Sequence, residues 1–240
     1  MESRDLPSAK SEKLNRYGIK GIISWYVLIT LSFLVLILSS GKLDWINAWV
    51  FYGLSLIYQT IDITYLLRKN PQILNERGKM IKEGTKTFDK IFVGFYLILT
   101  LISMYMIGLD ERLYAWSDLP FLTLYIGIAL TLPGFIIAFW AMISNPFFEL
   151  TARIQKDRNH KIIKAGPYQI IRHPGYAGEI LMLLATPLIL GSLLGFLPII
   201  AMVVLFIART GLEDRILKQE LSGYSEYINE VKYRLIPYVW

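Results

Sequence analysis

Residues 119–148 read LPFLTLYIGIALTLPGFIIAFWAMISNPFF, a stretch of 30 residues without a charged side chain. About 20 consecutive apolar residues are enough to span a bilayer as an α-helix. Four more charge-free runs occur along the chain, at 21–41, 45–61, 91–109 and 180–208. None of them alternates over segments of about ten residues, as transmembrane β-strands do. The sequence therefore predicts an all-α, polytopic bundle of transmembrane helices.

The composition supports a membrane protein. Of the 240 residues, 54% are hydrophobic and 18% are charged, against roughly 45–50% and about 25% in an average soluble domain. Mean hydropathy is +0.44. These values exclude an ordinary soluble enzyme, a secreted disulfide-rich domain and a disordered chain. The absence of cysteine excludes disulfides, thiolate metal sites and cysteine nucleophiles within this chain.

The positive charges predict which loops face the cytoplasm. Successive segments carry five, one, seven, one and six Lys and Arg residues, at 1–20, 39–44, 67–90, 109–118 and 144–178. The positive-inside rule places the first, third and fifth of these segments in the cytoplasm. The net charge of +6 is then explained by cytoplasmic loops, and no nucleic-acid partner is predicted.

The last run, 180–208, allows two topologies. As one helix its 29 residues would measure about 43 Å, which is too long for one upright span. Pro187, Gly191, Gly195 and Pro198 can break it. A single kinked crossing would place the C-terminal tail outside, whereas a hairpin turning near Gly191–Gly195 would return it to the cytoplasm. Since the tail is basic, the hairpin is favoured.

The predicted architecture is thus four spanning helices followed by a C-terminal helical hairpin, with both termini cytoplasmic. One membrane domain, 1–240, accounts for the chain, with the N-terminal transmembrane helices in 1–143. The candidate functional part, 144–240, consists of a polar loop, the helical hairpin and the C-terminal tail. Asp62 is the only acid well inside a run, and it is either functional or simply reaches the cytoplasmic interface.

Two polar segments are candidates for chemistry. The first reads GPYQIIRHPGYAGE at 166–179, and combines a cation, an imidazole and two tyrosines at the start of a membrane helix. In the second, Arg209 and Glu213 are four residues apart on one helix face at the end of the last run. The structural alternatives are a basic loop against an anionic leaflet and a surface ion pair. The aromatic tail could cover a ligand or anchor at lipid headgroups.

Several familiar sites are missing from the sequence. It contains no phosphate-binding P-loop, no Gly-x-Gly-x-x-Gly fingerprint and no Gly-x-Ser-x-Gly elbow. Its two histidines, His160 and His173, do not have metal-ligand spacing, so no metal is predicted. ATPases, Rossmann enzymes, serine hydrolases and catalytic zinc proteins are therefore disfavoured.

Two motifs together resemble the isoprenylcysteine carboxyl methyltransferase family, which is related to the membrane phospholipid N-methyltransferases. They are Gly166-Pro167-Tyr168 with Arg172-His173-Pro174-x-Tyr176-x-Gly178, and Arg209-x-x-x-Glu213-Asp214 with the ending Tyr224-x-x-Tyr227 and Tyr233-Arg234-Leu235-Ile236-Pro237. The resemblance covers residues 145–240. One departure is the second acid of the Glu213-Asp214 pair, which is Asp.

The resemblance implies S-adenosyl-L-methionine as the cofactor, bound on the cytoplasmic side, and a lipophilic acceptor that enters from the bilayer. Arg209 and Glu213 are the implied catalytic pair. The implied cofactor-binding residues are Gly166, Tyr168, Arg172, His173, Pro174, Tyr176, Gly178 and Glu213. The implied acceptor-binding residues are Arg209, Tyr233 and Arg234. A prenylcysteine-type or other lipid carboxylate is already ionised at neutral pH, so its methylation needs no strong general base.

Two other functions stay open. An NADPH-dependent, sterol-type membrane reductase could use the same loop for a nicotinamide. A non-enzymatic lipid transporter would show broken helices or midplane charges in corresponding halves, and only one broken run is visible. The membrane is the cell membrane of a prokaryote or the endoplasmic reticulum of a eukaryote. The sequence gives no oligomeric state.

Overall fold

A computed structural model describes residues 13–79, 82, 84–114, 117 and 119–240. Every regular element in these residues is helical. The long helices are α1 (Arg16–Ser40), α2 (Ile46–Lys69), α4 (Thr87–Leu109), α5 (Leu122–Ser144), α6 (Pro174–Leu190) and α7 (Phe196–Glu220). The short ones are α3 (Pro71–Arg77), the π-helix η1 (Asp110–Tyr114), the 3₁₀ helices η2 (Lys156–Arg158) and η3 (Gly166–Gln169), and α8 (Tyr224–Glu230). The all-α prediction is confirmed.

The last apolar run forms two helices, so the predicted hairpin is confirmed. Helices α1, α2, α4, α5 and α7 are long and apolar enough to cross a bilayer, while α6 has 17 residues. Helix α6 ends at Gly191, whose φ of +70° is readily adopted by glycine. The backbone N–H of Ser192 then donates to the Pro187 carbonyl at 2.9 Å. The chain turns at 191–195 and returns as α7.

A buried carboxylate holds this turn in place. Asp110 follows α4 and is 1% exposed. Its Oδ2 accepts hydrogen bonds from the hydroxyls of Ser192 and Ser117, and from the Leu194 backbone N–H at 3.4 Å. The side chain of Asp110 thereby joins the end of α4 to the hairpin turn.

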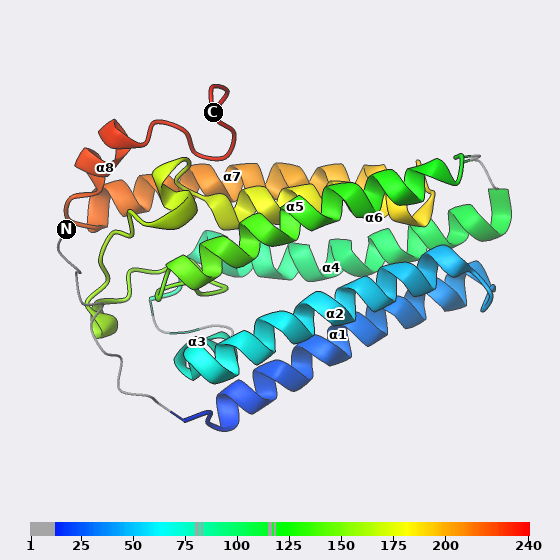
Figure 1. Ribbon diagram of the computed structural model, residues 1–240, viewed down its shortest axis with the longest axis horizontal. Helices are drawn as coiled ribbons and strands as arrows, with labels where there is room; N and C mark the ends of the chain where they lie inside the picture. The colour runs from blue at the N-terminus through cyan, green and yellow to red at the C-terminus, as the bar shows by residue number, and fades with distance from the viewer. Residues whose placement is uncertain (1–12, 80–81, 83, 115–116, 118) are drawn as a thin grey trace.

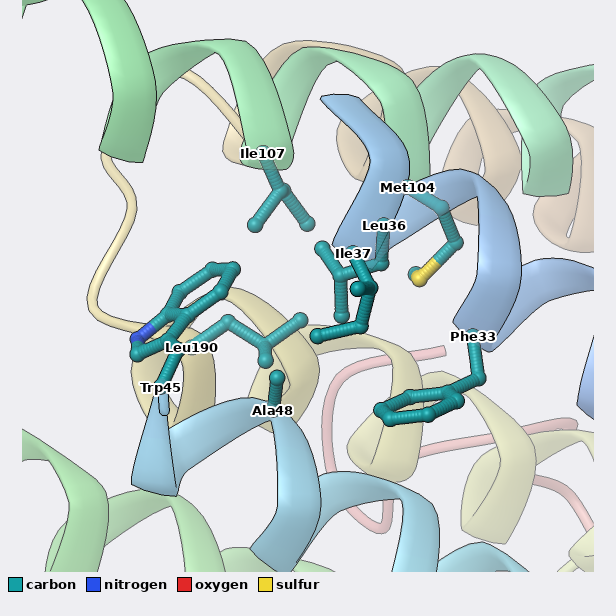
Figure 2. Packing of buried hydrophobic residues seen from close by; sticks show 8 residues of the cluster. All are labelled: Phe33, Leu36, Ile37, Trp45, Ala48, Met104, Ile107 and Leu190. Carbon is teal, nitrogen blue, oxygen red and sulfur yellow. The ribbon is translucent and has the colours of Figure 1, made fainter. Parts of the chain in front are cut away.

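An apolar cluster joins α1, α2, α4 and α6 at the end of the bundle that carries this turn. There Phe33, Leu36 and Ile37 of α1 pack with Trp45 and Ala48 near the start of α2, Met104 and Ile107 of α4, and Leu190 of α6 (Figure 2). Toward the other end α1 and α2 diverge from α4 (Figure 1), while Ile63 and Leu66 of α2 pack with Met142 of α5. Apolar packing therefore joins α1, α2, α4 and α6 at the turn end, and α2, α3 and α5 at the other.

Polar segments gather at the opposite end, here named the basic end. It carries the start of α1, α3, the start of α4, the loop 145–173, the end of α7 and α8 (Figure 1). These are the segments for which the sequence predicts one common side of the membrane. The structure brings them together, and their cytoplasmic placement stays a prediction.

Candidate functional site

Two cavities adjoin at the basic end. The smaller one, about 130 Å³, is enclosed by the loop 145–163, the start of α6, the end of α7 and α8. The larger one, here named the groove, measures about 1560 Å³ and runs between α1, α4, α6 and α7. Tyr176, on the first turn of α6, lines both cavities. It is one of six residues, at 148–149, 153–154 and 175–176, that line both cavities, so this tyrosine lies at their common boundary.

The carboxylate of Asp214 binds side chains from the arginine-histidine-proline loop, α8 and the C-terminal tail, and is here named the Asp214 cluster. Asp214 of α7 accepts two hydrogen bonds from Arg172, Nε to Oδ1 at 2.8 Å and Nη2 to Oδ2 at 2.9 Å. It also accepts from the Tyr224 hydroxyl at 2.9 Å and from Nε of Arg234 at 2.9 Å. His173 Nε2 lies 3.3 Å from Oδ1. Because the pair with Arg172 is bidentate and buried, it fixes geometry as well as charge.

The tail also forms backbone hydrogen bonds to the arginine-histidine-proline loop. The N–H groups of Arg172 and His173 donate to the carbonyls of Tyr233 and Arg234, both at 2.9 Å. Arg172 Nη1 donates to the carbonyls of Val231 and Lys232, both at 2.7 Å. The guanidinium of Arg172 therefore neutralises Asp214 while it holds the chain that leaves α8.

Tyr176 stands between the two cavities in a fixed orientation. Its hydroxyl donates to Oε2 of Glu213, which lines the smaller cavity. Its ring stacks on His173 at 5.6 Å between centroids and 8° between planes. The Arg209 guanidinium lies 4.9 Å from the ring centroid. An anion, an aromatic ring and a cation thus follow one another across the boundary between the cavities.

Arg209 is engaged by an acid of α4. Its Nε lies 2.7 Å from Asp89 Oδ1, and its Nη2 donates to Asp89 Oδ2 at 3.2 Å and to the Leu150 carbonyl at 2.6 Å. Asp89, which is 0% exposed, also accepts from the Ala152 N–H at 2.7 Å. Phe92 lies against the guanidinium at 4.3 Å. The charge of Arg209 is therefore neutralised, and its Nη1 takes part in none of these bonds.

The walls of the smaller cavity are rich in aromatic rings. Phe147 and His160 lie 4.6 Å apart between ring centroids. Tyr168 also lines the cavity, and its hydroxyl accepts a hydrogen bond from Asn145 Nδ2 at 3.1 Å. Burial lowers the pKa of His160 from its usual 6.5, so its ring is neutral at pH 7. Burial raises the pKa of Tyr168. The cavity therefore presents neutral rings beside the carboxylate of Glu213.

A network of acids and bases frames the mouth of the groove. Glu149 pairs with Lys82 at 2.8 Å and with Arg153 at 3.1 Å, and Lys82 also pairs with Glu76 at 2.6 Å. Burial alone would raise the pKa of Glu76, but hydrogen bonds from Lys82 and Lys79 outweigh it and lower this pKa. These ion pairs attach the loop 145–158 to the segment after α3.

The structure brings together some of the predicted site residues. Tyr168, Arg172, His173, Tyr176 and Glu213 line the smaller cavity, and Tyr176 and Arg209 line the groove. The remaining candidates, Gly166, Pro174, Gly178, Tyr233 and Arg234, lie outside the residues that line either cavity. Their proposed contacts with a ligand stay predictions.

These remaining candidates have visible packing contacts instead. A Cβ on Gly178 would lie 2.5 Å from the Gly134 carbonyl, so this glycine lets α6 approach α5 closely. Pro174 occupies the first position of α6, where its missing N–H has no helical partner to lose. Arg234 is committed to Asp214.

Sequence reasoning missed two acids that organise the site. The sequence pointed only weakly to a role for Asp214, through its place after Glu213 in the second motif. It gave almost no indication of a role for Asp89, because this acid lies just before the run 91–109, where an interfacial acid is common. Phe147 and His160 were also not assigned to the cavity. Only the fold shows that these side chains meet.

Residues 122–222 match the model of the phospholipid methyltransferase family. This range begins with α5 and ends just after α7, so it contains the first motif and Arg209-x-x-x-Glu213-Asp214 of the second. The ending of the second motif, at 224–237, lies beyond it. The predicted resemblance to this group of membrane methyltransferases is confirmed. No curated protein matches the chain. The family match and the apolar helices together support a membrane methyltransferase.

Proposed function

We propose that this protein transfers a methyl group from S-adenosyl-L-methionine to the headgroup of a lipid-like amphiphile. The smaller cavity holds the methyl donor and the groove holds the acceptor. The observation that carries the proposal is the position of Tyr176, which lines both cavities, with Glu213 on the donor side and Arg209 on the acceptor side.

The side chains of the smaller cavity suit this cofactor. Glu213 offers negative charge to a sulfonium, and the rings of Phe147 and His160 offer faces for an adenine. The cavity, about 130 Å³, is smaller than the roughly 300–1,000 Å³ of typical ligand pockets. We therefore expect the loop 145–163 to move outward when the cofactor binds.

The residues of the site act mainly by position. When bound, the cofactor supplies an electrophilic methyl group on a sulfonium. Glu213 holds the Tyr176 hydroxyl, Asp214 holds the loop that carries His173, and Asp89 holds Arg209. Such fixed placement of two reactants is worth roughly 7–11 kcal/mol of an activation barrier.

The groove suits an amphiphile. Trp25, Leu28 and Leu31 of α1 form an apolar wall, while Lys20 and Lys79 lie nearer the basic end. A prenylcysteine-type carboxylate would need a cation near the methyl group. Arg209 directs Nε and Nη2 to Asp89 and Leu150, so a carboxylate would have only Nη1 to bind. The positive-inside rule supports a cytoplasmic position for the donor cavity.

The proposal is tested by methyl transfer in nanodiscs. Purified protein is incubated with methyl-labelled S-adenosyl-L-methionine and a total polar lipid extract, and label is counted in the organic phase. We expect transfer, reduced roughly 100-fold or more in Tyr176→Ala, because donor and acceptor lose their common wall. The control Tyr238→Ala changes a residue that is 89% exposed and should stay within about twofold of the wild type.

Folded protein that transfers no label to any lipid would overturn the proposal. Reduction of a sterol-type double bond with NADPH, tested in parallel, would then favour the reductase alternative.

A further inference from the structure

The tail turn, here defined as residues 235–240, is a closed structure. The Trp240 carbonyl accepts hydrogen bonds from the N–H groups of Arg234, Leu235 and Ile236 at 2.8, 3.0 and 3.3 Å. The Arg234 guanidinium lies 4.8 Å from the centroid of the Trp240 ring, and the side chain of Leu235 is buried. The backbone of the turn is therefore fixed and attached to the body of the protein.

The other aliphatic side chains of the tail turn are exposed. Ile236 is 56% exposed and Val239 is 75% exposed. One exposed aliphatic side chain is ordinary on a protein surface, but two of them on one fixed turn form a small apolar tip. Because the transfer of such side chains out of water is favourable, this tip suits a lipid environment.

The tail turn begins at the level where the apolar surface of α7 ends. Leu212 is the last exposed large hydrophobic side chain of α7, and Asp214 follows about 3 Å further along the helix axis. Arg234 donates to Asp214 at 2.9 Å, which places the start of the turn at this level. The headgroup layer extends roughly 5–8 Å beyond the hydrocarbon core on each side of a bilayer. The turn therefore lies at the depth of lipid headgroups.

The path of the tail agrees with this depth. The chain runs back from α8 along α7, and the C-terminus lies between the two ends of α7 along the length of the bundle (Figure 1). Helix α8, in contrast, lies at the basic end itself (Figure 1). The turn is thereby directed back toward the membrane-spanning part of α7, which lipid surrounds.

The charge near the tail turn also favours lipid. Residues 231–240 contain two cations, Lys232 and Arg234, and no acidic side chain. Arg234 is engaged by Asp214, while Lys232 is exposed. A lysine at this depth can bind the phosphates of lipid headgroups. A two-fold contact with a second copy of the chain would instead bring two copies of Lys232 together, and like charges repel.

We propose that the tail turn anchors in the leaflet at the basic end, with Ile236 and Val239 among the lipids and Lys232 at their phosphates. The partner of this surface is the bilayer, and the proposed methyl transfer does not involve it. The sequence allows two uses of the aromatic tail, as a cover for a ligand or as an anchor at headgroups. The position and charge of the turn favour the anchor.

The anchor also acts on the arginine-histidine-proline loop. The carbonyls of Tyr233 and Arg234, just before the turn, accept the N–H groups of Arg172 and His173 at 2.9 Å. Lipid that binds the turn in this position therefore stabilises the loop beside the smaller cavity as well. We expect the two loop amides, of Arg172 and His173, to be better protected from exchange when the turn is anchored.

The first test measures depth with spin labels on protein in nanodiscs. The chain has no cysteine, so one introduced cysteine carries a nitroxide at a known place. Tyr238→Cys labels the turn and leaves Ile236 and Val239 unchanged, while Val204→Cys labels the exposed apolar face of α7 and Glu226→Cys labels α8. Oxygen concentrates in lipid and a nickel chelate stays in water. We expect the ratio of the two collision rates at position 238 to lie between those at 204 and 226.

The second test follows hydrogen exchange of the two loop amides in nanodiscs. The double variant Ile236→Asp with Val239→Asp should lower their protection roughly tenfold or more, since burial of one aliphatic side chain is worth about that factor. The matched control is Ser225→Asp with Asn229→Asp, which adds the same charge at exposed positions of α8 and should change the protection little.

Lipid composition separates anchoring from a purely internal role of the turn. In the wild type, protection of the two loop amides should be roughly fivefold higher in nanodiscs with anionic lipid than in zwitterionic ones, since one lysine near an anionic leaflet is worth about that factor. Lys232→Gln should remove this difference. Lys218→Gln, at an exposed lysine in the last turn of α7, should keep it.

A label at position 238 that meets the nickel chelate as often as the label at 226 would overturn the inference, because the turn would then lie in water. So would dipolar broadening at 238 that disappears on dilution with unlabelled protein, because a second copy would then cover the turn. Unchanged protection in the double variant, or a lipid dependence that survives in Lys232→Gln, would also contradict it. None of these readouts involves methyl transfer, so they remain decisive if the proposed function fails.

Discussion

Asp214→Asn should detach the tail from the arginine-histidine-proline loop. The substitution preserves size but places an NH₂ group opposite the donors of Arg172 and Arg234. Arg172 is 5% exposed, and removing the partner of a buried ion costs roughly 3–5 kcal/mol. Arg234 is one-third exposed, so its share is about 0–1 kcal/mol. The pair with Arg172 therefore dominates the expected loss.

Amide hydrogen exchange measures this loss of stability at two backbone hydrogen bonds. The N–H groups of Arg172 and His173 are held by carbonyls of the tail. Since about 1.4 kcal/mol corresponds to a factor of ten in an equilibrium constant, their protection should fall by roughly 100- to 1,000-fold or more. Protection in α4 and α5, away from the Asp214 cluster, should change little.

Asp157→Asn is the matched control, because its side chain is 59% exposed and its pair with Arg153 is expected to contribute only about 0–1 kcal/mol. Unchanged protection of Arg172 and His173 in Asp214→Asn would refute this prediction, since the Asp214 cluster would then not hold the tail. Equal loss in both variants would refute it as well, because burial would not matter.

Three further predictions concern other parts of the site. Arg209→Lys keeps the charge but loses the fork that binds Asp89 and Leu150, so kcat/KM for the lipid should fall at least roughly tenfold while calorimetric cofactor affinity stays unchanged; an equal loss of affinity would contradict this. Gly178→Ala should lower the thermal unfolding midpoint by several degrees, because the new methyl group meets the backbone of α5, whereas Gly94→Ala, which meets nothing within 4 Å, should not. Because burial lowers the pKa of His160, the unfolded chain binds this proton at a higher pH than the folded chain does. The stability linked to this group is therefore present above about pH 6.5 and is lost as the pH falls from there through the lowered pKa of the folded chain. His160→Phe should remove this dependence from thermal unfolding scans at pH 5–8.

The sequence was informative about the helices because the bilayer imposes length and polarity on them. Uninterrupted charge-free runs predicted the spanning helices, and the cluster around Gly191 and Gly195 predicted the hairpin turn. The short helix Pro71–Arg77 was missed, since seven residues within a basic segment carry no membrane-length pattern. Its packing against α1, where Asn75 accepts from the Asn15 N–H at 2.9 Å, depends on tertiary contact.

The site was predictable only where residues lie close in sequence. The motif around His173 and the spacing of Arg209 and Glu213 indicated the part of the chain that lines the two cavities. The acids that hold these groups, Asp89 and Asp214, act across 120 and 42 residues, and no local pattern reports such distances. Tyr233 belongs to the predicted acceptor-binding residues, but its carbonyl, rather than its ring, makes the observed contact with the loop.

The proposed methyl transfer requires the cofactor to bind in the cavity beside Glu213, and calorimetry measures this binding. S-adenosyl-L-methionine is titrated into detergent-purified protein, with NADPH titrated in parallel. We expect the methyl donor to bind with micromolar affinity, at least tenfold weaker in Glu213→Gln and unchanged in Glu226→Gln, an acid of α8 that does not line the cavity. Absence of binding in folded protein, or equal affinity in wild type and Glu213→Gln, would contradict the account.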